Sequence, residues 1–250
     1  GDCVILRYYA ENDAMYVFPI GNGDKKKALE QLFLYGQAKG EQIHLYGLLD
    51  YEVEQLKEWY PKHFRYEADR DMFDYIYETE HLANLSGKKF HGKRNHIARF
   101  MDDDDWEYEK LNSENLHECI DMNNNWIQKK YDDDAWSQDV QDEYDVVKGA
   151  LIDYKRLGLV GGVLKKYGEV VAFEIGEPLN DDTFVVHFEK AYADVQGAYP
   201  MINKQFVLHE CQGYKYVNRE EDDGEEGLRK AKLSYHPDIL LEKYNAYKIG

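Results

Sequence analysis

The sequence predicts an α+β fold in which mixed, mostly antiparallel sheets are covered by helices. Three observations support this class. Segments of strand type and of helix type alternate in both halves of the 250 residues. A unit of strand, glycine turn and helix occurs twice, at residues 75–100 and 185–210. The composition, with 43% hydrophobic and 32% charged residues, is that of a folded chain.

The repeated unit sets the expected domain organisation. Ala83 matches Ala193, and Gly87 matches Gly197, both at an offset of 110 residues. Internal repetition of this kind indicates an architecture of repeated modules. We therefore expect two domains, at residues 1–105 and 106–250, whose copies of the unit superpose.

Each glycine turn leads into a helix, and the free N–H groups at a helix start favour anions. A phosphate site at each turn is one hypothesis, and a plain strand-to-helix connection is the other. The anion site of the first repeat would be formed by Gly87, Lys88, Lys93 and Arg94.

The first domain is expected to begin with a hairpin. In chain order we expect strands at 3–9 and 15–21, a helix at 25–39, a strand at 42–48, a helix from 50 to 61, and two strands within 64–78. Asp24 can cap the first helix, and Gly40 can end it. Because the chain starts at Gly1 without a methionine, we expect this domain to lack a native N-terminal segment.

The second domain is expected to begin with two helices. In chain order we expect helices at 113–131 and 141–157, a hairpin at 159–176, a strand at 183–191, the second repeat unit, a strand at 214–221 and a tail at 229–249. The triplet 132–134 lacks the alternating ligands and the glycine of a calcium loop. The sequence predicts no metal site.

Charge and cysteine content restrict the partners and the compartment. The formal net charge of −18 disfavours binding to DNA and to anionic membranes. No apolar run approaches the ~20 residues of a membrane helix. The three cysteines are far apart and form no CxxC pair, which is typical of reduced thiols. We therefore predict a cytoplasmic protein.

A basic segment interrupts this acidic chain. Residues 88–99 contain five Lys or Arg, two His and no acidic residue. The segment could bind an anion, or it could be a helix face neutralised by the acidic residues at 102–105.

Particular strings indicate the family. The strings YETEHLANLSGKKFHGKRNHIARF (77–100), HFEKAYADVQGAYPMINKQF (187–206) and GLRKAKLSYHPDILLEKY (227–244) resemble a bacterial family related to the C-terminal domain of phosphatidylglycerol lysyltransferase. The resemblance covers nearly the whole chain. It implies two tandem GNAT-like (acyl-CoA N-acyltransferase-like) domains, akin to the Fem-type aminoacyltransferases that use aminoacyl-tRNA.

The resemblance implies a transferase that moves an acyl or aminoacyl group from a phosphate-bearing donor to an amine or hydroxyl. The GNAT pyrophosphate motif reads Gln/Arg-x-x-Gly-x-Gly/Ala, whereas this chain has Asp194 and Tyr199 at its two ends. We therefore expect aminoacyl-tRNA in preference to acetyl-CoA as the donor, with an acyl-CoA or another small acyl donor as the alternative. The alternative is a non-catalytic binding module that retains the fold. No further cofactor is implied.

Glu189 and Lys190, at the end of the second central strand, are the expected catalytic residues. Glu189 could accept the proton of the acceptor, and Lys190 could hold a phosphate or carboxylate. The alternative is an ion pair that fixes the strand. The expected donor-binding residues are Gly197, Ala198, Tyr199, Asn203, Lys204, Arg229, Lys230 and Lys232.

Some of these residues have a second interpretation. Arg229, Lys230 and Lys232 could simply neutralise the acidic loop at 220–226. His187 is expected to be an interior histidine rather than a base. As a functional hypothesis, we expect the catalytic and donor residues to converge on one cleft.

Overall fold

The computed structural model describes residues 2–10, 13–130 and 138–249. The chain forms two compact units, each built from segments far apart in the sequence. Unit 1 comprises Gly1–Tyr75, Glu221–Lys232 and Leu240–Gly250, and unit 2 comprises Ile76–Glu220 and Leu233–Ile239. This division differs from the boundary expected after residue 105, because residues 76–105 belong to unit 2 and the C-terminal segments return to unit 1. The triplet 132–134 lies outside the described residues.

Unit 1 is built on a five-stranded sheet with the order β2-β3-β5-β14-β6. Its strands are β2 (Arg7–Ala10), β3 (Asp13–Tyr16), β5 (His44–Leu48), β14 (Tyr244–Lys248) and β6 (Phe64–Ala68). Among the described residues of this sheet, β3 and β5 pair in parallel, and the other neighbouring strands pair in antiparallel. The short strands β1 (Cys3–Val4) and β4 (Ile20–Gly21) pair separately.

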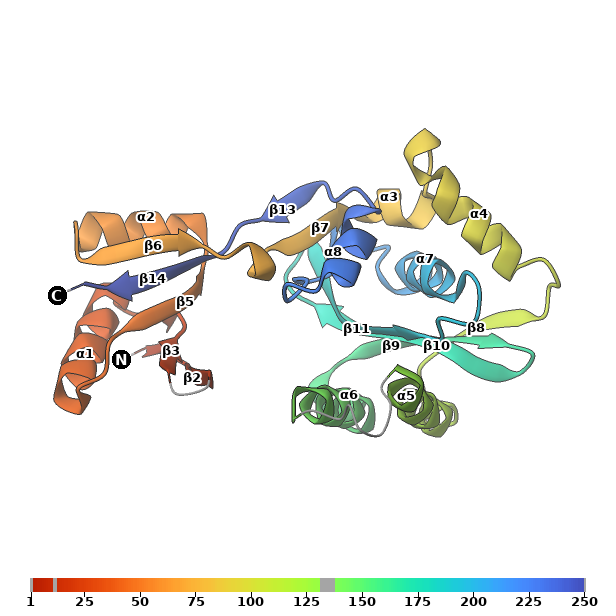
Figure 1. Cartoon of the computed structure of the whole chain (residues 1–250), viewed down its shortest axis with the longest axis horizontal. Coiled ribbons are helices and arrows are strands. Elements are labelled where there is room, and N and C mark those ends of the chain that lie inside the picture. Colours follow the sequence, from red (N-terminus) through yellow and green to blue (C-terminus); the bar gives the residue numbers. More distant parts are fainter. Residues whose placement is uncertain (1, 11–12, 131–137, 250) are drawn as a thin grey trace. The chain divides into compact units, whose positions relative to one another are not determined.

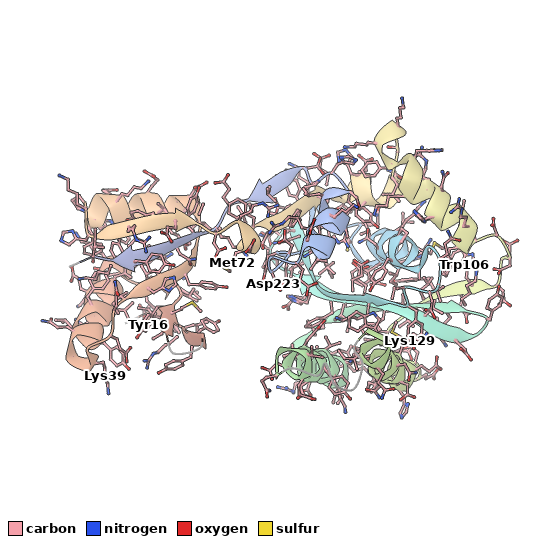
Figure 2. The ribbon with its side chains drawn as sticks, viewed as in Figure 1. Tyr16, Lys39, Met72, Trp106, Lys129 and Asp223 are labelled. Atoms are coloured by element: carbon pink, nitrogen blue, oxygen red, sulfur yellow. The ribbon has the colours of Figure 1, made fainter. Side chains whose placement is uncertain are left out.

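Three helices belong wholly or mainly to unit 1. They are α1 (Lys25–Lys39), α2 (Asp50–Trp59) and α8 (Glu226–Leu233), with the 3-10 turn η1 at Arg70–Met72. The predicted limits of α1 are confirmed. Asp24 accepts a hydrogen bond from the Lys27 N–H, and Gly40 ends the helix at φ +67°. Side chains of α1 and α2 pack with the sheet around Tyr16, which Figure 2 labels.

Unit 2 contains most of a seven-stranded sheet with the order β13-β7-β12-β11-β10-β9-β8. Its strands are β13 (Ile239–Leu241), β7 (Asp74–Glu78), β12 (Tyr216–Asn218), β11 (Thr183–Ala191), β10 (Glu169–Pro178), β9 (Val160–Lys166) and β8 (Trp106–Lys110). The mixed, mostly antiparallel character expected from the sequence is confirmed, since β11–β12 is a parallel pair among antiparallel ones.

Helices cover both faces of this sheet (Figure 1). Helices α5 (Leu116–Lys130) and α6 (Gln138–Leu157) lie on one face, and α7 (Ala198–Glu210) lies on the other. Helix α4 (His91–Phe100) packs on the outer side of α7, after the short segments α3 (Thr79–Asn84) and η2 (Lys88–Phe90). No helix in the described part of the chain is long and apolar enough to cross a membrane.

Strands β11 and β12 pair over only three residues each. Thr183–Val185 pair with Tyr216–Asn218, and among the described residues β11 then continues to Ala191 without a strand partner on that side. A bulge between Ile175 and Gly176 of β10 bends the neighbouring pair. The second half of β11, which carries Glu189, therefore extends beyond the end of its parallel neighbour.

The two copies of the repeated unit differ in one element. The second copy runs from β11 through a turn to α7, as expected. In the first copy, the helix α3 stands between β7 and the turn at Gly87. Both glycines adopt positive φ, +89° at Gly87 and +85° at Gly197. Superposition of the two copies stays a prediction.

Candidate functional site

Glu189 and Lys190 point to opposite faces of the sheet, as neighbours on a strand must. Lys190 is buried against α5 and α6, where it forms an ion pair with Glu143 and lies 3.9 Å from the ring centre of Trp126. Glu189 lies on the face of α7. The two side chains therefore do not pair with each other. The expectation that both act in one catalytic site is corrected, because they lie on opposite faces of the sheet.

Glu189 forms an ion pair with Arg219, which follows β12. Both side chains are largely buried, at 12% and 9% exposure. The guanidinium carbon of Arg219 lies 4.8 Å from the ring centre of Tyr235 and 5.8 Å from that of Tyr77. Burial works to lower the pKa of Arg219, but the charge of Glu189 raises it above its ordinary value. Arg219 is thus a permanent buried cation.

Glu174 of β10 stands directly opposite Glu189 in the sheet register. It is fully buried, and neither carboxyl oxygen has a hydrogen bond of good geometry within the described structure. The amide of Asn203, also fully buried, lies beside it and works to lower its pKa. Burial, followed by the charge of Glu189, nevertheless raises the pKa of Glu174 well above its usual range. This environment favours the protonated acid.

Lys93 reaches the same region from α4. Its Nζ lies 3.8 Å from the ring centre of Tyr235. Burial, then the positive charge of Arg219, lowers the pKa of Lys93 to about 8, against a smaller opposing effect of Glu189. A lysine with this pKa can exist as a neutral amine near physiological pH and can accept a proton.

We call this group the polar constellation; its members are Lys93, Glu174, Glu189, Asn203 and Arg219, with the rings of Tyr77 and Tyr235. All lie in unit 2. The group holds one firmly paired cation, one lysine that can lose its proton and two polar groups without satisfactory partners. A proton acceptor beside a fixed positive charge can deprotonate a nucleophile and stabilise a developing oxyanion.

His187 lies on the same strand but in a separate set of contacts. Its ring nitrogens are 2.8 Å from Glu220 and 3.1 Å from Glu177. The hydrogen bond to Glu220 raises the pKa of His187. It is a half-buried histidine held by carboxylates, which agrees with the structural role expected for it.

The turn at Gly197 is closed by protein. A Cβ at this glycine would lie 2.2 Å from the carbonyl oxygen of His96 in α4. Close approach of two backbones, together with positive φ, explains why glycine is needed here. Trp126 donates to the Ala191 carbonyl at 3.0 Å, and its Nε1 lies 3.3 Å from the Tyr199 hydroxyl. Tyr199 is thus directed toward α5 rather than toward Asn203, and Ala198 is buried.

The remaining donor candidates separate into two groups. Lys204 is half-buried on α7 of unit 2. The other three lie on α8 in unit 1: Arg229, Lys230 and Lys232. Arg229 forms ion pairs with Asp71 and Asp222, both at 2.6 Å. Lys232 donates to the Glu221 carbonyl, and Lys230 is exposed. The contacts of Arg229 and Lys232 support the alternative in which they stabilise the acidic loop.

The first-repeat candidates also have distinct roles. Arg94 donates to the carbonyls of Leu85 and Gly87, at 2.5 and 2.8 Å, and so fixes the turn. Lys88 is exposed, and Lys93 joins the polar constellation instead of a separate anion site at Gly87.

Sequence reasoning missed Glu174, Arg219, Tyr77 and Tyr235 as site residues. Glu174 could have been found, because it is the single charged residue within the apolar run VVAFEIG at 170–176. A charged residue inside an apolar strand is buried, and burial of an acid needs a reason. Arg219 lies in a polar segment and gives no such signal.

Comparisons with known proteins identify the family. The family described as "Phosphatidylglycerol lysyltransferase, C-terminal" matches residues 1–247. An uncharacterised protein of Mycoplasmoides gallisepticum is 25% identical over 211 residues, which cover 81% of this chain and 64% of that protein. The chain thus spans less than two thirds of the length of this curated relative.

Solved structures give the fold. A conserved protein of unknown function from Bacteroides thetaiotaomicron is 39% identical, with a TM-score of 0.92 over 99% of this chain and 83% of that one. A C-terminal domain assigned to a lysylphosphatidylglycerol synthetase of Agrobacterium fabrum is 15% identical, with a TM-score of 0.71 over 100% and 82%. FemX is 11% identical, with a TM-score of 0.60 over 98% and 84%. The α+β, GNAT-like fold expected from the sequence is confirmed.

Proposed function

The chain belongs to the family of phosphatidylglycerol lysyltransferase C-terminal domains, and on this premise we propose that it transfers an aminoacyl or acyl group to an amine or hydroxyl acceptor. The donor is a phosphate-bearing molecule, aminoacyl-tRNA in preference to acetyl-CoA. One observation carries the proposal. Lys93, whose pKa burial lowers to about 8, lies in contact with the same aromatic ring as the buried cation Arg219.

These two residues can divide the chemistry of acyl transfer. The acceptor must lose a proton as it attacks the ester carbonyl, and the carbonyl oxygen becomes negative in the tetrahedral intermediate. We assign the proton to Lys93 as a neutral amine. Collapse of the intermediate breaks the ester C–O bond of the donor, and the protonated Lys93 gives this proton to the leaving oxygen. The oxyanion is stabilised by Arg219, and Glu189 holds the guanidinium in place through its ion pair. Glu189 is therefore a positioning residue in this scheme rather than the base.

The choice of donor rests on the turn at Gly197. In GNAT enzymes that bind acetyl-CoA, the pyrophosphate occupies this turn, as the resemblance implies. Here the carbonyl of His96 crowds it, and Asp194 and Tyr199 stand at the ends of the motif. We therefore expect weak or no binding of acetyl-CoA. The three cysteines are unpaired, which supports the reducing cytoplasm as the compartment.

The crowded turn also favours a second candidate function. A binding module that retains the fold but has lost the donor site would show the same closure at Gly197. In that case Lys93 and Arg219 would hold a ligand without transferring a group. The two candidates differ in a single measurable property, which is turnover.

Transfer from radiolabelled aminoacyl-tRNA to amine and lipid acceptors tests the proposal. We expect Lys93→Met to reduce the rate by about 10²–10⁴-fold, the usual contribution of general acid–base catalysis. In the native protein the rate should rise between pH 7 and 9, because the neutral form of Lys93 increases as pH passes its pKa of about 8. This rise should be absent in Lys93→Met. Lys39→Met, an exposed lysine on α1 that Figure 2 labels, is the control.

Three outcomes would count against this function. Full activity in Lys93→Met would remove its assigned role. Absence of transfer from every aminoacyl-tRNA would favour the binding module. Calorimetry that gives a micromolar dissociation constant for acetyl-CoA, about −8 kcal/mol, would restore the acetyltransferase alternative.

A further inference from the structure

We propose that His187 is a positioning residue for the transfer reaction, because its side chain fixes the β-bulge and the loop that together orient Glu189 and Arg219. This inference rests on the proposed function, in which Arg219 stabilises the oxyanion and Glu189 holds Arg219 in place. His187, its carboxylate partners Glu177 and Glu220, and the pair that it orients all lie in unit 2.

His187 is the extra residue of the bulge in β11. Phe188 pairs with Ile175 of β10. The next residue of β10, Gly176, pairs with Val186. His187 is therefore left over between these two pairs. An extra residue of this kind redirects side chains, and bulges are frequent beside active sites.

The bulge decides which face of the sheet receives Glu189. Phe184, which lies before the bulge, packs on Phe206 of α7, with the ring centres 5.7 Å apart. In a regular strand Phe188 would share this face, since residues four apart point the same way. Phe188 instead packs with the core on the side of α5 and α6. The extra residue thus reverses the alternation and turns Glu189 to the face of α7.

The ring of His187 ties the bulge to two other segments. Its Nε2 lies 3.1 Å from a carboxyl oxygen of Glu177 in β10, and its Nδ1 lies 2.8 Å from one of Glu220, which follows β12. A carboxylate can only accept hydrogen bonds, so a ring that bridges both carboxylates donates from both nitrogens and is positively charged. The pKa of His187 is raised accordingly, chiefly by the hydrogen bond to Glu220, against burial, and the charges of both carboxylates add to the rise.

The link to Glu220 does not require the charged ring. Loss of one proton leaves one N–H on the imidazole. We place it on Nδ1, because the contact with Glu220 is the shorter of the two. The link between His187 and the loop is therefore kept over the pH range in which Lys93 loses its proton.

Glu220 carries this restraint to Arg219, its neighbour in sequence. On the other side of Arg219, Asn218 is the last residue of β12 and pairs with Val185. Glu220 adopts φ +55°, which is uncommon for a residue with a side chain and persists where contacts hold it. Two contacts do so here, from His187 and from the Asn218 side chain, whose Oδ1 accepts the Glu220 N–H at 2.8 Å. Arg219 is thus held at both ends, although it lies beyond the paired part of β12.

Substitutions that keep one side of the imidazole separate the two links. The amide nitrogen of asparagine takes the place of Nδ1, and that of glutamine takes the place of Nε2. His187→Asn should therefore keep the bond to Glu220, His187→Gln should keep the bond to Glu177, and His187→Ala should lose both. His117→Ala is the control, because His117 also contacts a carboxylate, that of Asp121 at 2.9 Å, but its side chain is 85% exposed.

The first measurement is the rate of transfer. We expect His187→Ala to lower kcat about 10²-fold, a loss of the size that a misplacement of about 1 Å can cause, with little change in KM. His187→Gln should behave like His187→Ala. His187→Asn should recover most of the native kcat, and His117→Ala should keep it. A residue needed only for folding would not separate asparagine from glutamine in this order.

The second measurement requires no turnover. Burial, then the charge of Arg219, lowers the pKa of Lys93, and the charge of Glu189 opposes this. If His187→Ala releases Arg219, the pKa of Lys93 should rise from about 8 toward the ordinary value of about 10.4. NMR of the whole chain with ¹³C-labelled lysine measures this pKa, with the Lys93 signal assigned through Lys93→Met.

Glu220→Ala and Glu177→Ala make the same comparison from the partner side, and they serve if His187→Ala does not fold. The two side chains are similarly exposed, at 36% and 41%. Glu220→Ala should lower kcat and raise the pKa of Lys93, whereas Glu177→Ala should have the smaller effect on both. Removal of a negative charge would by itself lower the pKa of a lysine, so a rise in Glu220→Ala reports displacement of Arg219.

Three outcomes would overturn the proposal. One is a native kcat and a native Lys93 pKa in both His187→Ala and Glu220→Ala. Another is an equal loss of kcat in His187→Asn and His187→Gln. The third is a raised Lys93 pKa with no loss of kcat.

Failure of the proposed function would look different. If the native chain transfers no group, yet the pKa of Lys93 rises in His187→Ala and Glu220→Ala, the orientation of Arg219 by His187 stands and the function falls. If these variants transfer with the native kcat, the function stands and the role of His187 falls.

Discussion

Two buried acids of this molecule have opposite surroundings. Asp222 of unit 1 is fully buried and accepts hydrogen bonds from the Tyr75 hydroxyl at 2.5 Å, from Arg229 at 2.6 Å and from the Gly224 N–H at 3.0 Å. Glu174 of unit 2 is equally buried, and neither of its oxygens has such a bond in the described structure. Figure 2 labels two residues that help to locate Asp222 and Tyr75 in the sequence: Asp223, which follows Asp222, and Met72, which lies three residues before Tyr75.

The difference separates stabilising polar groups from costly ones. Burial alone would raise the pKa of Asp222, but the hydrogen bonds from Arg229 and Tyr75 hold it at about 2. Burial raises the pKa of Glu174 well above its usual range, and nothing reverses the shift. A buried acid that is fully hydrogen-bonded stabilises a fold, whereas an unsatisfied one lowers its stability and calls for another reason. We place that reason in the polar constellation.

The largest expected effect is the loss of stability when Asp222 is removed from its hydrogen bonds. Asp222→Ala should lower the free energy of unfolding by about 3–5 kcal/mol, because it leaves Arg70 and Arg229 without the buried carboxylate with which both form ion pairs. Urea denaturation followed by tryptophan fluorescence measures this loss. The pH dependence has a defined sign. Stability from Asp222 is present above about pH 4 and is lost as pH falls toward 2, since its folded pKa is depressed.

The control for this variant is Asp71→Ala. Asp71 also binds Arg229, but it is 58% exposed, and exposed ion pairs contribute less than about 1 kcal/mol. Losses of the same size in both variants would show that burial does not distinguish the two carboxylates, and the comparison would fail.

Local signals made much of the fold predictable. Capping residues and glycine placed α1 at its observed limits, and alternating apolar residues located the hairpin of β9 and β10. The α+β class followed from the order of these elements. The compact units were not predictable in the same way, because β14 and α8 return to unit 1 from the far end of the chain. Such long-range pairing leaves no local pattern.

The site was predictable only in part. Glu189 and Asn203 were chosen by their place after a central strand and on the following helix, and both lie in the polar constellation. Lys190 was chosen, like Glu189, by its place at the end of the central strand, yet successive strand residues face opposite sides. Lys93 was assigned to the first repeat, because the packing of α4 on α7 cannot be deduced from spacing.

A middle-sized effect tests how the constellation keeps its shape. Lys93 is held there by the packing of α4 on the turn at Gly197, where the His96 carbonyl leaves no space for a Cβ. Gly197→Ala should lower the free energy of unfolding by about 2–3 kcal/mol, from the strain of positive φ and the forced backbone shift. It should also reduce the rate of transfer. Guanidinium denaturation measures the change in stability, and the radiolabel assay measures the change in transfer.

Gly87→Ala is the matched substitution in the other turn. Gly87 also has positive φ, at +89°, but a Cβ would meet no atom within 4 Å. Only the backbone strain applies, so about 1 kcal/mol is expected. If Gly87→Ala impairs transfer as much as Gly197→Ala, packing of α4 on α7 is not what positions Lys93.

The smallest effect, and the opposite in sign, is expected at Glu174. Glu174→Gln keeps the shape of the side chain and removes a group that ionises in the unfolded chain but resists ionisation in the folded one. Below the unfolded pKa of about 4.3, both forms are neutral, and the two proteins should be equally stable. As pH rises toward the raised folded pKa, the native protein loses stability because its unfolded state gains from ionisation. At pH 7 the variant should therefore be the more stable of the two proteins, as urea denaturation at pH 4 and pH 7 would measure. Destabilisation at both pH values would mean that the carboxyl group is well satisfied in the folded protein, and Glu174 would then resemble Asp222 rather than contrast with it.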